Sequence, residues 1–173
     1  MSIPVEKVKI PALSPKTRQG RGTLNTPFDP EYLPGAHNAV NVCLRVQPSE
    51  QVCLITDEAT IEIASAVARE IEKVGAPYQA WVLEDLAVRP LKDLPREILD
   101  DLETSQVSIF AVQVQTNELR SRIQMTDVVN RRKIRHAHMV NINREIMLEG
   151  MRADFQRVDR LSQQVVEMVR KAS

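Results

Sequence analysis

Residues 51–77, QVCLITDEATIEIASAVAREIEKVGAP, decide the fold. The run QVCLIT is short, apolar and β-branched, which is typical of a strand buried on both faces. The segment that follows places apolar residues at helical spacing: Ile61, Ala64, Val67, Ala68, Ile71 and Val74. Gly75 suits the end of that helix, and Pro77 prevents its continuation. The stretch therefore predicts a strand, a helix and a turn, with Asp57 or Thr56 capping the helix.

The same alternation continues along the chain. Further strands are expected at YQAWVLE (78–84), QVSIFAVQV (106–114) and KIRHAHMV (133–140), and further helices from Pro34 and over 96–103, 117–131, 143–150 and 154–171. Strands that alternate with helices indicate βαβ units and a parallel sheet. We expect an α/β fold, a Rossmann-like or flavodoxin-like three-layer αβα domain with a mostly parallel sheet of about four strands.

Two helices carry specific predictions about their buried faces. The helix at 117–131 is expected to pack through Leu119, Ile123, Val128 and Val129. The helix at 154–171 is expected to turn one apolar face in a single direction: Phe155, Val158, Leu161, Val165, Met168 and Val169. Residues 1–31 contain five prolines and no periodicity, so we expect an extended N-terminal arm with a few anchoring contacts, followed by a single α/β domain over 32–173.

Composition narrows the class of protein. The chain has 173 residues, 43% of them hydrophobic, and its 23 basic residues equal its 23 acidic residues, so no global charge points to nucleic acid. Cys43 and Cys53 each stand between apolar neighbours and are expected to be buried free thiols in a reducing compartment. No apolar run reaches the roughly 18 residues of a membrane span, and the N-terminus lacks a signal-peptide core. We expect a cytoplasmic protein.

Chemistry in an open parallel sheet is expected beyond the carboxyl ends of the strands. The polar residues that the sequence assigns to those ends are Thr56, Asp57, Glu58, Glu84, Asp85, Gln113, Gln115, Thr116, Asn117, Glu118, His136, His138, Asn141 and Asn143. No G-x-G-x-x-G, P-loop or G-x-S-x-G motif accompanies them. For Asp57 and Glu58, satisfying free N–H groups at a helix start is favoured over a metal or substrate role.

His136 and His138 stand two apart in a predicted strand, so they face the same side. Together they could supply two zinc ligands, but a zinc site takes at least three, and His37 is far away in sequence. A hydrogen-bonded positioning role, a packing role and metal ligation all stay open. We expect no metal to be bound by this chain.

Three segments resemble a known family: GAHNAVNVCLRVQPSEQVCLITDEAT, SIFAVQVQTNELRSRIQMTDVV and RHAHMVNINREIMLEGMRADF. From about residue 34 onward they are similar to the N-terminal half of the leucyl aminopeptidase or aminopeptidase T-like metal-dependent exopeptidases. The resemblance implies a C-terminal domain with a two-metal centre of the zinc, cobalt or manganese class, a peptide substrate and a homodimer. It carries no catalytic residue into this chain. The same superfamily includes iron-dependent ring-cleaving dioxygenases of the dihydroxypyridine type.

The expected role of the chain is therefore that of an N-terminal domain that contacts substrate and forms an interdomain or dimer surface. The residues expected to do so are Asn117, Arg120, His136, His138 and Arg144. The simpler alternative pairs Arg120 with Glu118 and Arg144 with Glu145 on the surface. The alternative function is a stand-alone α/β module that binds a small ligand or a protein.

Overall fold

The computed structural model describes residues 22–172. The elements in chain order are η1 (Pro30–Tyr32), α1 (Leu33–His37), η2 (Asn38–Cys43), β1 (Val52–Thr56), α2 (Ile61–Val74), β2 (Tyr78–Val82), α3 (Leu83–Leu86), α4 (Arg96–Thr104), β3 (Val107–Val112), α5 (Leu119–Arg132), β4 (Arg135–Val140), α6 (Arg144–Leu148), η3 (Gly150–Arg152) and α7 (Phe155–Ala172). Residues 1–21 of the expected N-terminal arm lie outside the described part. Its remainder is anchored, because Leu24 is buried and its N–H donates to the Tyr78 hydroxyl over 3.2 Å.

The sheet has four strands in the order β2-β1-β3-β4, and every neighbouring pair is parallel. Leu54 in β1 stands in register with Ala80 in β2 and with Ile109 in β3. The predicted α/β fold with a three-layer αβα arrangement is confirmed. The buried, β-branched composition of β1 follows from its central place in the sheet, where no residue of the strand reaches water.

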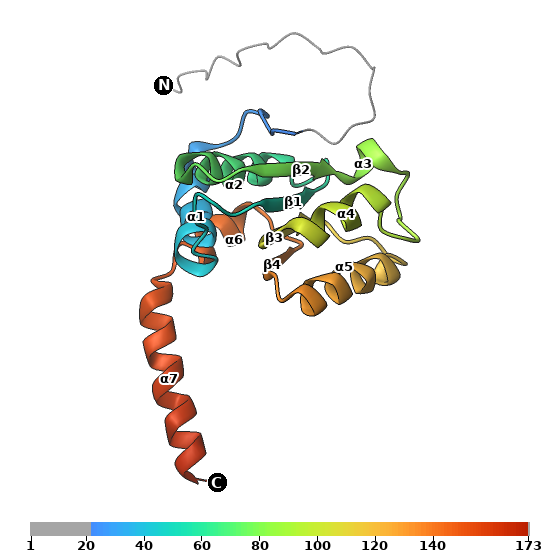
Figure 1. Cartoon of the computed structure of the whole chain (residues 1–173). Helices are drawn as coiled ribbons and strands as arrows, with labels where there is room; N and C mark the ends of the chain where they lie inside the picture. Colours follow the sequence, from blue (N-terminus) through green and yellow to red (C-terminus); the bar gives the residue numbers. More distant parts are fainter. Residues whose placement is uncertain (1–21, 173) are drawn as a thin grey trace, which may run out of the picture.

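Helices cover both faces of the sheet (Figure 1). Val52 and Leu54 turn to one face and pack in a core with α1, η2, α2 and α6. Cys53 and Ile55 turn to the other face and pack in a second core with α4 and α5. The period of two along β1 therefore supplies side chains to both cores.

Helix α2 ends as the sequence predicts. Gly75 adopts φ 80°, and its N–H donates to the carbonyl oxygens of Ile71 and Glu72. Helix α5 ends in the same way, but on Lys133 at φ 56°, a left-handed conformation that favours glycine and that a lysine rarely adopts. Ala64, Val67, Ala68 and Ile71 form the buried face of α2, as predicted.

Two predictions of burial are wrong. In α5, Leu119 is 61% exposed and Ile123 is also exposed, whereas Met125, Val128 and Val129 pack on the sheet. At 3.6 residues per turn, Leu119 and Ile123 fall on the side of α5 opposite Met125 and Val128, so one helix could not bury both sets. Cys43 is exposed rather than buried, because it lies on the outer side of η2; Cys53 is buried as predicted.

Helix α7 leaves the packed body of the chain (Figure 1), and none of its residues is buried. Its main neighbour is η2. The predicted one-sided apolar pattern is present, yet it lies in the open instead of facing the domain core. Over residues 22–172, no helix combines the length and the apolar character needed to cross a membrane.

Candidate functional site

The strand order places the topological switch point between β1 and β3. The chain runs from β1 to β2 on one side and then crosses to β3 on the other side of β1. In such sheets the crossover helices diverge at the carboxyl ends of these two central strands, which makes this edge the usual place for a ligand. In this chain β1 ends at Thr56 and β3 ends at Val112.

Asp57 follows β1 and joins the ends of the two central strands. Its side chain is fully buried. Oδ1 accepts from the Thr60 N–H over 2.9 Å and from the Thr60 hydroxyl over 2.7 Å, and Oδ2 accepts from the Gln113 N–H over 2.7 Å. Asp57 therefore accepts an N–H just before α2, but the predicted cap on Asp57 or Thr56 is wrong, because the N-cap residue is Thr60 and its side chain makes no capping bond. The second oxygen of Asp57 has a further partner that no local pattern could indicate.

That partner is Arg89, from the segment between α3 and α4. Its side chain is 4% exposed, and all five of its N–H groups are used. Nη1 donates to Asp57 Oδ2 over 2.6 Å and to Glu84 Oε1 over 3.1 Å. Nε donates to Glu118 Oε1 over 2.8 Å, and Nη2 donates to Glu118 Oε2 over 2.6 Å. Nη2 also donates to the Gln113 carbonyl oxygen over 2.7 Å. The guanidinium therefore ties together the ends of three strands.

Glu118 completes this buried cluster. It also accepts from the N–H groups of Leu91 over 2.9 Å and Gln115 over 3.1 Å. Burial acts to raise the pKa of Glu118, but the hydrogen bonds from Arg89, Leu91 and Gln115 outweigh it and lower that pKa to about 2. The hydrogen bonds from Arg89 to Glu118, and then those to Asp57 and Glu84, raise the pKa of Arg89 despite its burial. The cluster of Arg89, Asp57, Glu84 and Glu118 is thus a satisfied internal brace that occupies the switch point itself.

An open pocket of about 310 Å³ adjoins this brace at the same edge of the sheet. Its lining comes from the segment before η1, η1 itself, the start of α2, the end of β3 and the start of α6: Thr26, Tyr32, Glu58, Ala59, Ile61, Glu62, Ile63, Gln113, Ile142, Asn143 and Arg144. Three of its polar residues, Glu58, Gln113 and Asn143, were assigned to the strand ends from the sequence. Tyr32 and Glu62 were not, because each lies on a helical face whose neighbours only the fold reveals.

Among the charged residues that line the pocket, the arginine has ion-pair partners and, in the part of the chain that the structure describes, the two glutamates do not. Arg144 Nη2 lies 3.1 Å from Asp29 Oδ2 and 3.9 Å from Glu31 Oε2. Glu58 and Glu62 are exposed and form no ion pair within residues 22–172. Burial and then the charge of Glu62 raise the pKa of Tyr32, which keeps its hydroxyl protonated. The pocket therefore offers two carboxylates without a cation beside one arginine that already has acidic partners.

The five predicted site residues are not brought together. Arg144 lines the pocket, but Asn117 and Arg120 lie at the start of α5 and do not. Asn117 has φ 74°, and Arg120 Nε lies 2.9 Å from Asp93 Oδ1. The simpler alternative was also wrong in its partners, because Arg120 pairs with Asp93 instead of Glu118.

His136 and His138 lie inside β4 rather than beyond its end, which corrects the prediction that they belong to the strand-end edge. His136 Nδ1 lies 2.7 Å from Ser108 Oγ, and His136 Nε2 lies 3.0 Å from His138 Nδ1. The His138 ring stacks on Phe110 with 5.4 Å between ring centroids. These contacts support the positioning or packing alternatives over metal ligation, because both nitrogens of His136 already have partners.

The hydrogen bond between Ser108 and His136 resembles that of an activated serine nucleophile, but a substrate cannot reach the serine. Ser108 is fully buried on β3, so a substrate carbonyl cannot reach its hydroxyl. Burial, and then the neighbouring His138, lower the pKa of His136 to about 4. The imidazole is therefore neutral at pH 7. Within residues 22–172, no three His, Cys, Asp or Glu side chains gather in a geometry that could hold a metal ion.

Comparisons of the chain with protein-family models, with curated proteins and with solved structures each gave no match. The geometry defines an α/β domain with a braced switch point and an adjoining polar pocket.

Proposed function

We propose that this chain is the N-terminal α/β domain of a leucyl aminopeptidase-like metallo-exopeptidase, and that its pocket at the carboxyl edge of the sheet binds the amino-terminal end of a peptide. The observation that carries the proposal is the pair Glu58 and Glu62, two carboxylates at one pocket wall with no cationic partner in the described residues. A peptide ammonium group supplies the missing charge.

The other pocket residues suit the rest of a short peptide. The side chains of Gln113 and Asn143 carry amides that both donate and accept, and such groups match a peptide bond. Asn143 Oδ1 already accepts from the Ile146 N–H over 2.9 Å, so its amide nitrogen is the group that reaches a substrate carbonyl. Arg144, held by Asp29, adds a donor for a carbonyl oxygen or a carboxylate.

The catalytic metal of this proposal belongs to a different domain. His136 and His138 do not fit it, because His136 already bonds to Ser108 and to His138. A divalent ion of the zinc, cobalt or manganese class, held by a C-terminal domain, would activate water and polarise the scissile carbonyl. We further propose a cytoplasmic location, a homodimer, and the C-terminal catalytic domain and the peptide as partners. The dioxygenase alternative rests on the resemblance alone.

Peptide binding by the chain tests the proposal directly. In a heteronuclear NMR titration, leucyl-glycinamide should shift the amide signals of Glu62 and Asn143, whereas N-acetyl-leucyl-glycinamide should not. Glu62→Gln should weaken binding about tenfold, which is about 1.4 kcal/mol. Glu97→Gln, at an exposed glutamate of α4 remote from the pocket, is the matched control and should leave binding unchanged. Equal binding of the acetylated peptide, or no effect of Glu62→Gln, contradicts the proposal.

The same pocket also supports a stand-alone binding module, and two observations separate the two functions. A reading frame that continues past codon 173 with clusters of Glu, His and Asp favours the exopeptidase. A stop codon there, together with peptide binding by the chain, favours the module. With either outcome, purified chain should not hydrolyse leucyl p-nitroanilide above background, and metal-dependent turnover that survives a contamination control would contradict this expectation.

A further inference from the structure

Helix α7 presents the largest group of exposed apolar side chains in the described residues. Val158, Leu161, Val165 and Met168 are each about half exposed or more, and Met168 reaches 66%. The helix has 18 residues and projects away from the packed body of the chain (Figure 1). An isolated apolar stripe of this kind marks an interaction surface.

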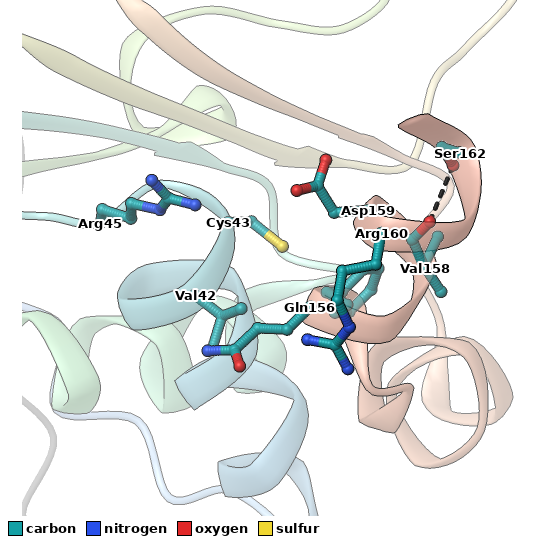
Figure 2. Close-up of a pocket in the computed structure, with 9 residues that line it drawn as sticks. Val42, Cys43, Arg45, Gln156, Val158, Asp159, Arg160 and Ser162 are labelled. Carbon is teal, nitrogen blue, oxygen red and sulfur yellow. Dashed lines mark hydrogen bonds between the residues drawn. The ribbon is translucent and has the colours of Figure 1, made fainter. Parts of the chain in front are cut away.

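The body of the same chain leaves most of this stripe uncovered, and among the stripe residues Val158 alone lines a cleft that faces the body. A cleft of about 540 Å³ separates η2 from the first turns of α7, and Figure 2 shows Cys43 directed from η2 toward it. Asp159 and Arg160 line the helix side of this cleft, so closing it would bury two charges. Leu161, Val165 and Met168 do not line it. These three side chains are therefore exposed for contact with another molecule.

The spacing of the stripe indicates what that molecule is. Val158, Leu161, Val165, Met168 and Ala172 are separated by alternating steps of three and four residues. This is the 3.5-residue repeat of a coiled coil, with Val158, Val165 and Ala172 at first positions and Leu161 and Met168 at fourth positions. In parallel coiled coils, valine at the first position with leucine at the fourth favours a pair of helices over larger assemblies. Val169 flanks this seam, and Val166 lies outside it.

The charges beside the seam distinguish the two orientations of a pair. In a parallel pair, Arg157 lies beside Ser162 of the second copy, and Gln164 beside Val169 of the second copy, so no like charges meet. In an antiparallel pair with the same apolar layers, Arg157 lies beside Lys171 of the second copy at both ends. That arrangement is repulsive at both contacts.

We propose that α7 is a self-association helix, which pairs in parallel and in register with α7 of a second copy of this chain. The polar side of the helix agrees with this arrangement. Gln163 Nε2 donates to Asp159 Oδ2 over 3.0 Å on the face opposite the seam, which stays in water in the pair. The two bodies then lie at the same end of the paired helices, joined through the turn at Ala153.

Sedimentation equilibrium of the full chain tests the association. The average mass should rise from one chain toward two as concentration increases. Leu161→Asp should return it to one chain, and Gln163→Asp, on the polar face, should not. Because these side chains are exposed, both variants should keep the thermal unfolding temperature of the body. A single chain at every concentration, a larger assembly than two, or a pair that survives Leu161→Asp would overturn the proposal.

Disulfide cross-linking tests the orientation. In a Cys43→Ser background, which removes the exposed native thiol, Val165→Cys should cross-link under mild oxidation, since the two copies of residue 165 meet in a parallel pair. Gln164→Cys meets its own copy only in the antiparallel pair, so it should cross-link poorly. Fast cross-linking by Gln164→Cys, with slow cross-linking by Val165→Cys, would overturn the parallel arrangement.

Discussion

Arg89 Nη1 lies 2.6 Å from Asp57 Oδ2, and both side chains are shielded from water. The two residues are 32 positions apart in the chain. Their contact closes the switch point with a group from the protein itself. The open pocket at this edge of the sheet therefore lies beside this pair, where Glu58, Glu62 and Arg144 line it.

The first prediction follows from this contact. Arg89→Ala leaves Asp57 and Glu118 buried without their cation, and should lower the free energy of unfolding by about 3–5 kcal/mol. Urea denaturation measures it. Arg120→Ala is the control, because Arg120 pairs with Asp93 in the open, and should cost less than about 1 kcal/mol. Similar losses for the two variants would contradict the role given to the brace.

The second prediction concerns acid. The folded pKa of Glu118 is about 2, below the unfolded value of about 4.3. The unfolded chain therefore binds the proton first, and the free energy of unfolding should fall as pH drops from about 5 to about 2. Urea midpoints across this range measure the slope. Glu118→Gln should reduce this dependence of the unfolding free energy on pH, whereas Glu97→Gln, at an exposed site, should not. If Glu118→Gln leaves the slope unchanged, other carboxylates produce it.

The fold was predictable because its signals are local. Within residues 51–77, a β-branched run indicates a strand, a helical period indicates a helix, and Gly75 indicates where the helix ends. Each of these signals depends only on neighbouring residues. Arg89 was missed because its importance comes from Asp57 and Glu118, 32 and 29 residues away. One signal was present: acids at the ends of three neighbouring strands, with an arginine in the segment between two of them.

His136 and His138 were misplaced for a related reason. Polar residues usually mark the end of a buried strand, but β4 is an edge strand, and such strands accept polar side chains along their length. Part of the pocket lining belongs to the strand ends that the sequence identifies. Glu58, Gln113 and Asn143 follow strands in the sequence, whereas Tyr32 and Glu62 join them only through the packing of η1 and α2.

The third prediction tests the packing of α1 on α6. A Cβ added at Gly35 would lie 2.8 Å from the Met147 carbonyl oxygen, which belongs to the backbone and cannot turn aside. Gly35→Ala should lower the free energy of unfolding by about 1–3 kcal/mol. Gly150→Ala is the control, since nothing lies within 4 Å of a Cβ there. Thermal unfolding of both variants measures the difference, and equal unfolding temperatures would show that α1 can shift freely.

The last prediction uses His136. Its folded pKa is about 4 and its ordinary value is 6.5, because burial between Ser108 and His138 disfavours the charged ring. The unfolded state takes up the proton first, so this residue should lower the free energy of unfolding as pH falls from about 6.5 to about 4. The loss should be complete below the folded pKa. NMR titration of the imidazole protons gives the folded pKa, and urea midpoints over the same range give the slope.

His136→Gln keeps an acceptor for Ser108 and removes the proton-binding ring, so it should remove this part of the slope. If the ring titrates near 6.5 in the folded chain, water reaches His136. The contact with Ser108 would then be consistent with an accessible nucleophile and its base.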